Sequence, residues 1–241
     1  MYYGYGYEYG MDPMYFLVIL AFIFSMVAQT KVSTTFNKYS RVRNRAGFTG
    51  AQVATQMLQN AGIYDVSVQR VAGNLTDHYD PRTKTLRLSQ SVYDSTSVAA
   101  LGVAAHETGH AIQHDVGYGP LALRSMLVPL ANFGSKLAMP LILAGILFST
   151  VVMVADALVY AGIACFGFSL VFQLVTLPTE YNASRRAIRS LESCMRLSDD
   201  EIVGSKKVLN AAALTYVAAL TVTIMQLLRL LIRVKRNDRT D

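Results

Sequence analysis

Long stretches without a charged side chain are the feature that most restricts how this chain can fold. Four such stretches occur, and they cover residues 14–28, 137–155, 157–178 and 208–228. A helix of about 20 apolar residues spans the hydrocarbon core of a bilayer. Hydrophobic residues make up 52% of the 241 residues and charged residues only 16%, which is the balance of a membrane protein. The sequence therefore predicts a mostly α membrane protein with about four membrane helices.

The second and third stretches form one unit. Only Asp156 separates them, and a single helix of their combined length would be far longer than a bilayer is thick. We therefore predict a membrane helical hairpin over residues 137–178 that turns near residues 154–160. Both ends of a hairpin emerge on the same side of the membrane. The fourth segment, residues 208–232, contains several polar side chains and is predicted to be either a membrane helix or a core helix packed on the others.

The distribution of basic residues predicts the orientation. Lysines and arginines without acidic residues among them follow the first stretch between residues 31 and 45, whereas residues 1–13 contain none. The positive-inside rule then places the N-terminus outside, and it places residues 29–136 and 179–207 in the cytoplasm. The basic tail, residues 233–241, would break this rule if the fourth segment crosses the membrane. The predicted location is the plasma membrane, with several crossings.

The first apolar segment is predicted to be a retained anchor. Residues 1–12 form a Tyr/Gly-rich leader that we expect to be disordered. That leader has acidic residues and no lysine or arginine, so residues 13–28 do not resemble a signal peptide. The formal charge of +6 is concentrated at membrane edges, and we expect no nucleic-acid partner. Cys165 and Cys194 are predicted to stay reduced, because one lies in a membrane stretch and the other in a cytoplasmic segment.

The motif His106-Glu-Thr-Gly-His110 predicts a metal site. Residues 97–106 are rich in alanine and free of proline, and residues 94–96 offer possible N-caps, so the motif is expected on a helix. Histidines at positions i and i+4 of a helix share one face, where both imidazoles can bind one Zn²⁺. Glu107 is then placed to reach a water beside the ion.

Glu180 is the predicted third ligand. It follows the hairpin of residues 137–178, which returns the chain to the side of the membrane that holds the two histidines. The alternative is that Glu180 forms an interfacial ion pair with Arg185 or Arg186. His114 is two helical turns from the first histidine and is interpreted as a bystander or as a neighbour of a ligand. Weaker candidates for the third ligand are Asp77, His78, Asp80 and Glu192.

The rest of residues 29–136 predicts a small α+β domain. Residues 49–62 have a threonine cap and a terminal glycine, as a short helix would. Residues 66–71 alternate like a strand, and residues 75–89 read as a hairpin. An extended peptide could add to the edge of this sheet, or the hairpin could simply cover the metal helix. Both interpretations stay open.

Five segments together form a specific match to a known family, both in their sequences and in their order along the chain. They are residues 36–40, 75–82, 103–114, 177–186 and 208–217. On these segments the chain resembles the YugP-like neutral zinc metallopeptidases of bacterial membranes. More distantly it is similar to HtpX and the CAAX prenyl proteases, in which a His-Glu-x-x-His helix and a later glutamate flank a membrane hairpin. Those relatives have an aspartate where Ser184 stands here, and a hydroxyl accepts a hydrogen bond from an imidazole more weakly than a carboxylate does.

The resemblance implies a zincin-like (gluzincin) domain and an integral-membrane zinc metalloendopeptidase. Its Zn²⁺ would be held by His106, His110 and Glu180, with Glu107 as general base. Protein or peptide substrates, including membrane proteins in quality control, and the lipid bilayer are the expected partners. Donors to the developing oxyanion are expected among His78, Tyr79 and Tyr181.

Two other classes of function remain as alternatives. One is a non-catalytic membrane protein whose zinc is structural or sensory. A transporter is less favoured, because no acidic or basic residue lies well inside a predicted membrane helix.

Overall fold

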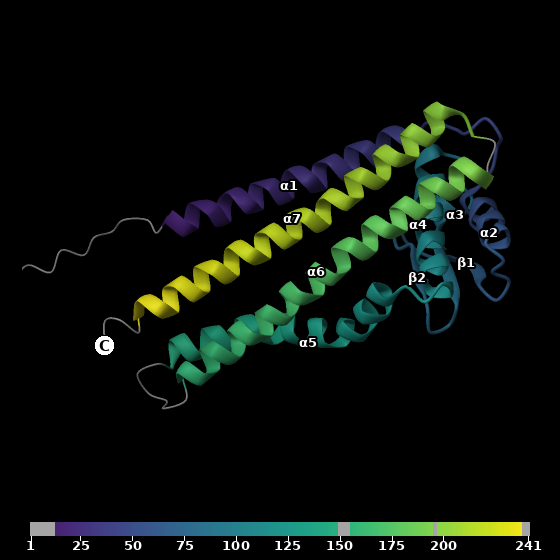
Figure 1. The fold of residues 1–241 in the computed structure, drawn as a ribbon. Helices are drawn as coiled ribbons and strands as arrows, with labels where there is room; N and C mark the ends of the chain where they lie inside the picture. Colours follow the sequence, from purple (N-terminus) through teal and green to yellow (C-terminus); the bar gives the residue numbers. More distant parts are fainter. Residues whose placement is uncertain (1–12, 149–154, 195–196, 238–241) are drawn as a thin grey trace, which may run out of the picture.

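Four long helices and a small α+β domain make up the described part of the protein. The computed structural model describes residues 13–148, 155–194 and 197–237 (Figure 1), so the predicted leader and the end of the basic tail lie outside it. The long helices are α1 (Pro13–Tyr39), α5 (Gly119–Leu147), α6 (Ala155–Cys194) and α7 (Asp199–Asn237). The domain consists of α2 (Gly50–Asn60), β1 (Ser67–Val71), β2 (His78–Asp80), β3 (Thr85–Ser89), α3 (Gln90–Tyr93) and α4 (Val98–Asp115).

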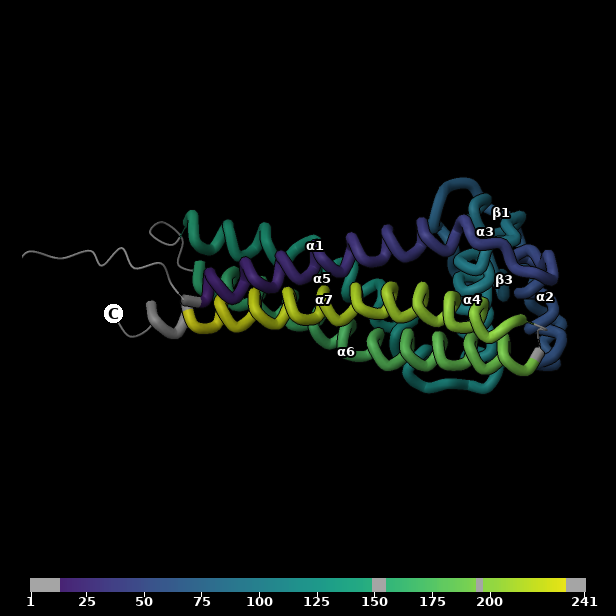
Figure 2. The backbone as a smooth tube through the Cα atoms, turned by 90° about the horizontal axis from the view of Figure 1, so that it is seen from above, coloured from purple at the N-terminus to yellow at the C-terminus, as the bar shows by residue number. Residues whose placement is uncertain are grey.

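The four long helices lie side by side in one elongated bundle with the domain at one end (Figures 1 and 2). Each is long and apolar enough to cross a membrane. Helix α7 packs between α1 and α6, and α5 packs on α6. Large apolar side chains point outward, among them Phe16 and Met26 at 64% and 70% exposure. Such a surface suits lipid rather than water, and it agrees with the predicted mostly helical membrane protein.

The helices extend beyond the charge-free stretches. Helix α1 continues to Tyr39, and α5 begins at Gly119 instead of near residue 137. The predicted region of residues 29–136 therefore includes the end of α1 and more than half of α5. The difference has a simple cause, since lysine, arginine and glutamine are good helix formers and do not stop a helix at the membrane edge. The predicted turn near residues 154–160 is wrong for residues 155–160, which belong to α6; α5 ends at Leu147, and residues 149–154 lie outside the described part.

Helix α7 contains the whole fourth apolar segment and runs away from the domain (Figure 1). Its far end lies beside the start of α1, where the Arg229 guanidinium is 3.6 Å from the centre of the Tyr15 ring. A cation–π contact of this kind gives a basic residue a partner at this end of the bundle. By length and composition α7 could cross a membrane, as one of the two predicted alternatives requires.

The domain contains a three-stranded sheet with the order β1-β3-β2. Strands β2 and β3 are antiparallel and form the predicted hairpin, while β1 is parallel to β3. Helix α2 begins with a capping box between Thr49 and Gln52, as its sequence predicted a threonine cap. Leu86 and Leu88 of β3 are fully buried against the alanine face of α4. This packing fixes the sheet beside the helix that carries the motif.

Helix α4 carries both histidines of the motif. Its N-cap is Ser97, whose Oγ accepts from the backbone N–H of Ala100, and not one of residues 94–96 as predicted. The carbonyl of Thr96 accepts from Asn44, and Ser97 pairs with Arg43 in an isolated bridge. These contacts keep the preceding residues extended, so the helix begins one residue later. Helix α4 then packs against both α6 and α7.

Candidate metal centre

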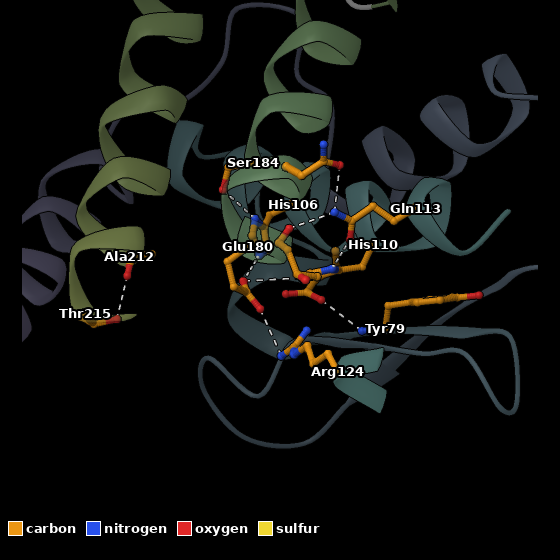
Figure 3. Close-up of polar contacts among 12 residues, drawn as sticks. Tyr79, His106, His110, Gln113, Arg124, Glu180, Ser184, Ala212 and Thr215 are labelled. Carbon is orange, nitrogen blue, oxygen red and sulfur yellow. Dashed lines mark hydrogen bonds and ion pairs between the residues drawn. The ribbon is translucent and has the colours of Figure 1, made fainter. Parts of the chain in front are cut away.

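Three side chains converge where α4 meets α6. His106 Nε2 lies 3.0 Å from Glu180 Oε2, and His110 Nε2 lies 3.6 Å from the same oxygen (Figure 3). One ligand atom from each of the three lies within 4.8 Å of the others. Two imidazole nitrogens and one carboxylate oxygen are a donor set typical of zinc. The structure thus brings together the three residues that the sequence predicted as ligands.

Gly109, inside the motif, allows the two helices to approach. A Cβ atom at this position would lie 2.5 Å from the carbonyl oxygen of Ala183. Only glycine leaves room for that backbone contact. Because Gly109 stands next to His110, and Ala183 lies one turn beyond Glu180, the contact sets the distance between the ligands from the two helices.

Gln113 fixes the orientation of the His110 ring. The Gln113 amide nitrogen donates to the carbonyl of Thr179 and to Asn182 Oδ1, at 2.9 and 3.0 Å. Its Oε1 therefore faces His110 Nδ1, 2.9 Å away, and can only accept. His110 must then carry its proton on Nδ1, which leaves the lone pair of Nε2 free for a metal ion. Gln113 is fully buried.

Ser184 holds the second imidazole. Its Oγ lies 3.1 Å from His106 Nδ1, which is the place where the sequence comparison with relatives expected a carboxylate. Burial of the His106 ring lowers its pKa, but its bond to the Glu180 carboxylate and the nearby Glu107 outweigh this and raise the pKa above the usual value. The two carboxylates thus stabilise positive charge at this place, as expected of a cation site.

Arg124 of α5 completes the surroundings of Glu180. Its Nη2 lies 3.1 Å from Glu180 Oε1, the oxygen that faces away from the histidines. The contact is an ion pair without hydrogen-bond alignment, since Oε1 has no hydrogen-bond partner. The Glu180 side chain is almost fully buried, so this charge requires cationic neighbours. The predicted alternative pairing with Arg185 or Arg186 is wrong, because Arg124 takes that place.

Glu107 lies beside the three ligands and is held by the sheet. Its Oε2 accepts a hydrogen bond of 3.0 Å from the backbone N–H of Tyr79 in β2. The Tyr79 hydroxyl bonds to His114 Nδ1 at 2.8 Å, so it faces away from the ligands (Figure 3). Burial raises the pKa of Tyr79 to about 12. His114 is therefore remote from the three ligands and contacts the strand that orients Glu107.

A cavity of about 280 Å³ opens at these residues. It is lined by His106, Glu107, His110 and Glu180, and by side chains from β2, α5 and α7. Two of these side chains, Arg124 and Tyr216, were not predicted as site residues. Tyr216 lies in a segment quoted for the family resemblance, and that was the available signal. No local pattern marked Arg124, because it reaches the site only through the packing of α5 on α6.

The weaker candidates for the third ligand do not join the three converging side chains, although Asp77 and His78 line the cavity. Asp77 accepts from the backbone and hydroxyl of Ser89, and burial raises the pKa of its carboxyl. Asp80 caps the turn between β2 and β3, where the Thr83 hydroxyl, followed by Arg82 and Arg87, lowers the pKa of its carboxyl to about 2. His78 lines the cavity, but Tyr181 does not and is 44% exposed. Tyr181 is therefore a poor oxyanion donor, contrary to the expectation.

Comparisons with known proteins agree with this picture. Residues 14–235 match a family model described as “Putative neutral zinc metallopeptidase”. The chain is 46% identical over 214 residues to the protein of Bacillus subtilis (strain 168) named “Putative membrane protease YugP”. That alignment covers 89% of this chain and 93% of the relative. No solved structure matches the chain significantly. With nearly its whole length matched, the chain belongs to the family that this zinc metallopeptidase model describes.

Proposed function

We propose that the protein is an integral-membrane zinc metalloendopeptidase. The observation that supports this most directly is the convergence of His106, His110 and Glu180 on one point, with Glu107 beside them in an open cavity. A structural zinc site usually has four protein ligands, whereas a catalytic site has three and keeps one position open. Among the described residues only three such ligands come together here.

The residues divide the chemistry between them. His106, His110 and Glu180 would hold the zinc ion, and their buried, oriented side chains fit it. Bound zinc supplies Lewis acidity, which polarises a peptide carbonyl and lowers the pKa of water towards about 7. Glu107 uses Oε2 to accept from Tyr79, so its Oε1 is the oxygen that accepts a proton from water. The same oxygen then returns the proton to the leaving amine.

The sheet contributes mainly by orienting Glu107. Strand β2 is an edge strand, and an extended peptide could add to such an edge. The N–H of Tyr79, however, already donates to Glu107. A peptide added along β2 would have to do without this donor, so we favour the interpretation in which the hairpin covers and positions the metal helix. Arg124, His78 and Tyr216 line the cavity and are the groups available to bind a substrate carbonyl.

The cytoplasmic side is proposed for the site. The basic residues between 31 and 45, and those between 185 and 207, lie towards the domain end of the bundle. The positive-inside rule supports a cytoplasmic domain on this basis. Glu180 directly follows the charge-free stretch of α6, so the site would lie close to the inner membrane surface. Unfolded or unassembled membrane proteins, as in quality control, are the substrates that fit this position best.

Replacement of Glu107 tests the proposal. Purified Glu107→Gln is expected to keep one zinc per chain and to lose hydrolysis of unfolded protein substrates by at least 10²-fold. Asp200→Asn, which removes an exposed carboxylate that lines neither cavity at the metal centre, is the control and should retain activity. Substantial hydrolysis by a clean Glu107→Gln preparation would refute the role of Glu107 as base.

The non-catalytic alternative has a different signature. A structural or sensory zinc site would bind the ion without an exchangeable water, and the wild-type protein would cleave neither soluble nor membrane substrates. Zinc stoichiometry combined with an assay on both substrate types separates the two functions.

A further inference from the structure

A second cavity lies between α6 and α7, outside the catalytic cavity. Its volume is about 370 Å³, so it exceeds the catalytic cavity in size. Three basic side chains line it: Arg185 and Arg189 from α6, and Lys206 from α7. Glu192 is the one acidic residue in its lining, which leaves an excess of two positive charges. We call this space the α6–α7 basic cavity.

The three cations have no ion-pair partner in the described part of the chain. Their neighbour Arg186 differs, because it donates to Asn182 and lies 5.9 Å from the Tyr118 ring centre. The positive-inside rule accounts for basic residues at the membrane edge, but it does not require three of them to line one cavity. All three side chains are exposed, so water screens their mutual repulsion, whereas an anion among them would be attracted by three cations at once.

The position of the cavity indicates where such an anion comes from. The charge-free stretch of α6 ends at Thr179 and that of α7 begins at Val208. At 1.5 Å per residue, Lys206 lies about 3 Å, Arg185 about 9 Å and Arg189 about 15 Å beyond these limits. The headgroup layer on each side of the hydrocarbon core is about 5–8 Å thick. Arginine and lysine side chains can bridge the remaining distance.

We propose that the α6–α7 basic cavity binds the phosphate group of an anionic membrane lipid. Arginine is suited to this because its guanidinium donates two parallel hydrogen bonds to phosphate oxygens. Arg185 and Arg189 are one helical turn apart on one face of α6, and Lys206 faces them from α7. Basic pockets between membrane helices bind lipid headgroups in this way.

The cavity adjoins the metal centre. Ser184 and Leu209 line both this cavity and a smaller one that contains His106, Glu107 and Glu180. Ser184 is the hydrogen-bond partner of His106. A lipid in the basic cavity would therefore lie on the far side of the residue that orients a metal ligand.

Lipid retention by the full chain tests the proposal. The protein, purified in a neutral detergent, is mixed with equal amounts of phosphatidylglycerol and phosphatidylcholine, and retained lipid is measured by native mass spectrometry. The variant Arg185→Gln/Arg189→Gln/Lys206→Gln should lose the preference for phosphatidylglycerol by about tenfold or more. The control variant Lys31→Gln/Arg41→Gln/Lys207→Gln loses the same charge from exposed positions outside the cavity and should keep that preference.

Each outcome decides the proposal. Equal loss in both variants would show that only general surface charge attracts the lipid, and it would overturn the site. Displacement of phosphatidylglycerol by millimolar inorganic phosphate, with phosphate held in its place, would overturn the lipid as ligand in favour of a soluble phosphate. Wild-type helicity and zinc content in both variants exclude misfolding as the cause. The measurement does not depend on proteolysis, so its result stands whether or not the proposed function does.

Discussion

Gly109→Ala should damage the metal centre without touching a ligand. The added Cβ would lie 2.5 Å from the Ala183 carbonyl oxygen, whereas ordinary contact begins near 3.4 Å. Relief of this overlap requires α4 and α6 to separate locally by about 0.9 Å, estimated from that difference. Zinc–ligand distances tolerate changes of only about 0.2 Å. His110 and Glu180 would then no longer bind one ion with good geometry.

The expected magnitude follows from the size of that displacement. A misplacement of about 1 Å in a catalytic site can reduce the rate about 10²-fold, and disturbed ligand orientation weakens metal binding by about 10- to 100-fold. We expect losses of this size in both hydrolysis and zinc affinity, measured by competition with a chromophoric chelator. Helix propensity alone predicts that Gly109→Ala would stabilise the protein, because alanine stabilises a helix by about 1 kcal/mol relative to glycine.

Gly102→Ala is the matched control on the same helix. Its Cβ would meet Ser205 of α7 at 3.4 Å, which is ordinary contact. This variant should bind zinc as the wild type does and should be equally or more stable. If Gly109→Ala also keeps wild-type zinc affinity and activity, the close approach of α4 and α6 does not set the ligand geometry and the reasoning is refuted.

Three further predictions concern residues around the ligands. Gln113→Leu leaves His110 Nδ1 without its acceptor and should weaken zinc binding about 10- to 100-fold by chelator competition; unchanged affinity would contradict the tautomer argument. Ser184→Asp should strengthen zinc binding and Ser184→Ala should weaken it, since a carboxylate accepts from an imidazole better than a hydroxyl; the reverse order would be inconsistent with this contact. Because burial raises the pKa of Asp77 in the folded protein, its ionisation costs stability above that pKa and nothing below the ordinary value. Asp77→Asn should therefore melt at a higher temperature than the wild type at neutral pH, and the difference should vanish as the pH falls below about 4; a pH-independent difference would rule out this linkage.

The elements with a strong local signal were predictable from the sequence. The charge-free stretches predicted the long helices, because apolar side chains over some 20 residues have few alternatives to crossing a membrane. The capping residue Thr49 marked the start of α2. Helix ends next to the membrane were not predictable in this way, since α1 and α5 extend through charged residues that form helices equally well.

The residues around the ligands show where local reasoning stops. Glu180 could be placed because the hairpin restricts which side of the membrane it can occupy. Arg124 could not, because its contact with Glu180 depends on how α5 crosses α6. The hydrogen bond from Gln113 to the Thr179 carbonyl likewise joins two helices, and its two residues are 66 positions apart in the sequence. Such contacts arise from packing geometry, which the pattern along a single helix does not contain.

The candidate metal centre lies where two parts of the molecule with different kinds of packing meet. His106 and His110 belong to α4, which packs on the sheet and forms with it a hydrophobic core of the kind found in water-soluble domains. Glu180 belongs to a helix whose apolar stretch ends one residue earlier, at Thr179. With α6 crossing the bilayer as proposed, the depth of this carboxylate depends on the position of α6 in the membrane, whereas the depth of the histidines depends on the packing of α4 on α6. Both constraints meet at Gly109, because there the backbones of α4 and α6 lie too close together for any side chain to fit between them.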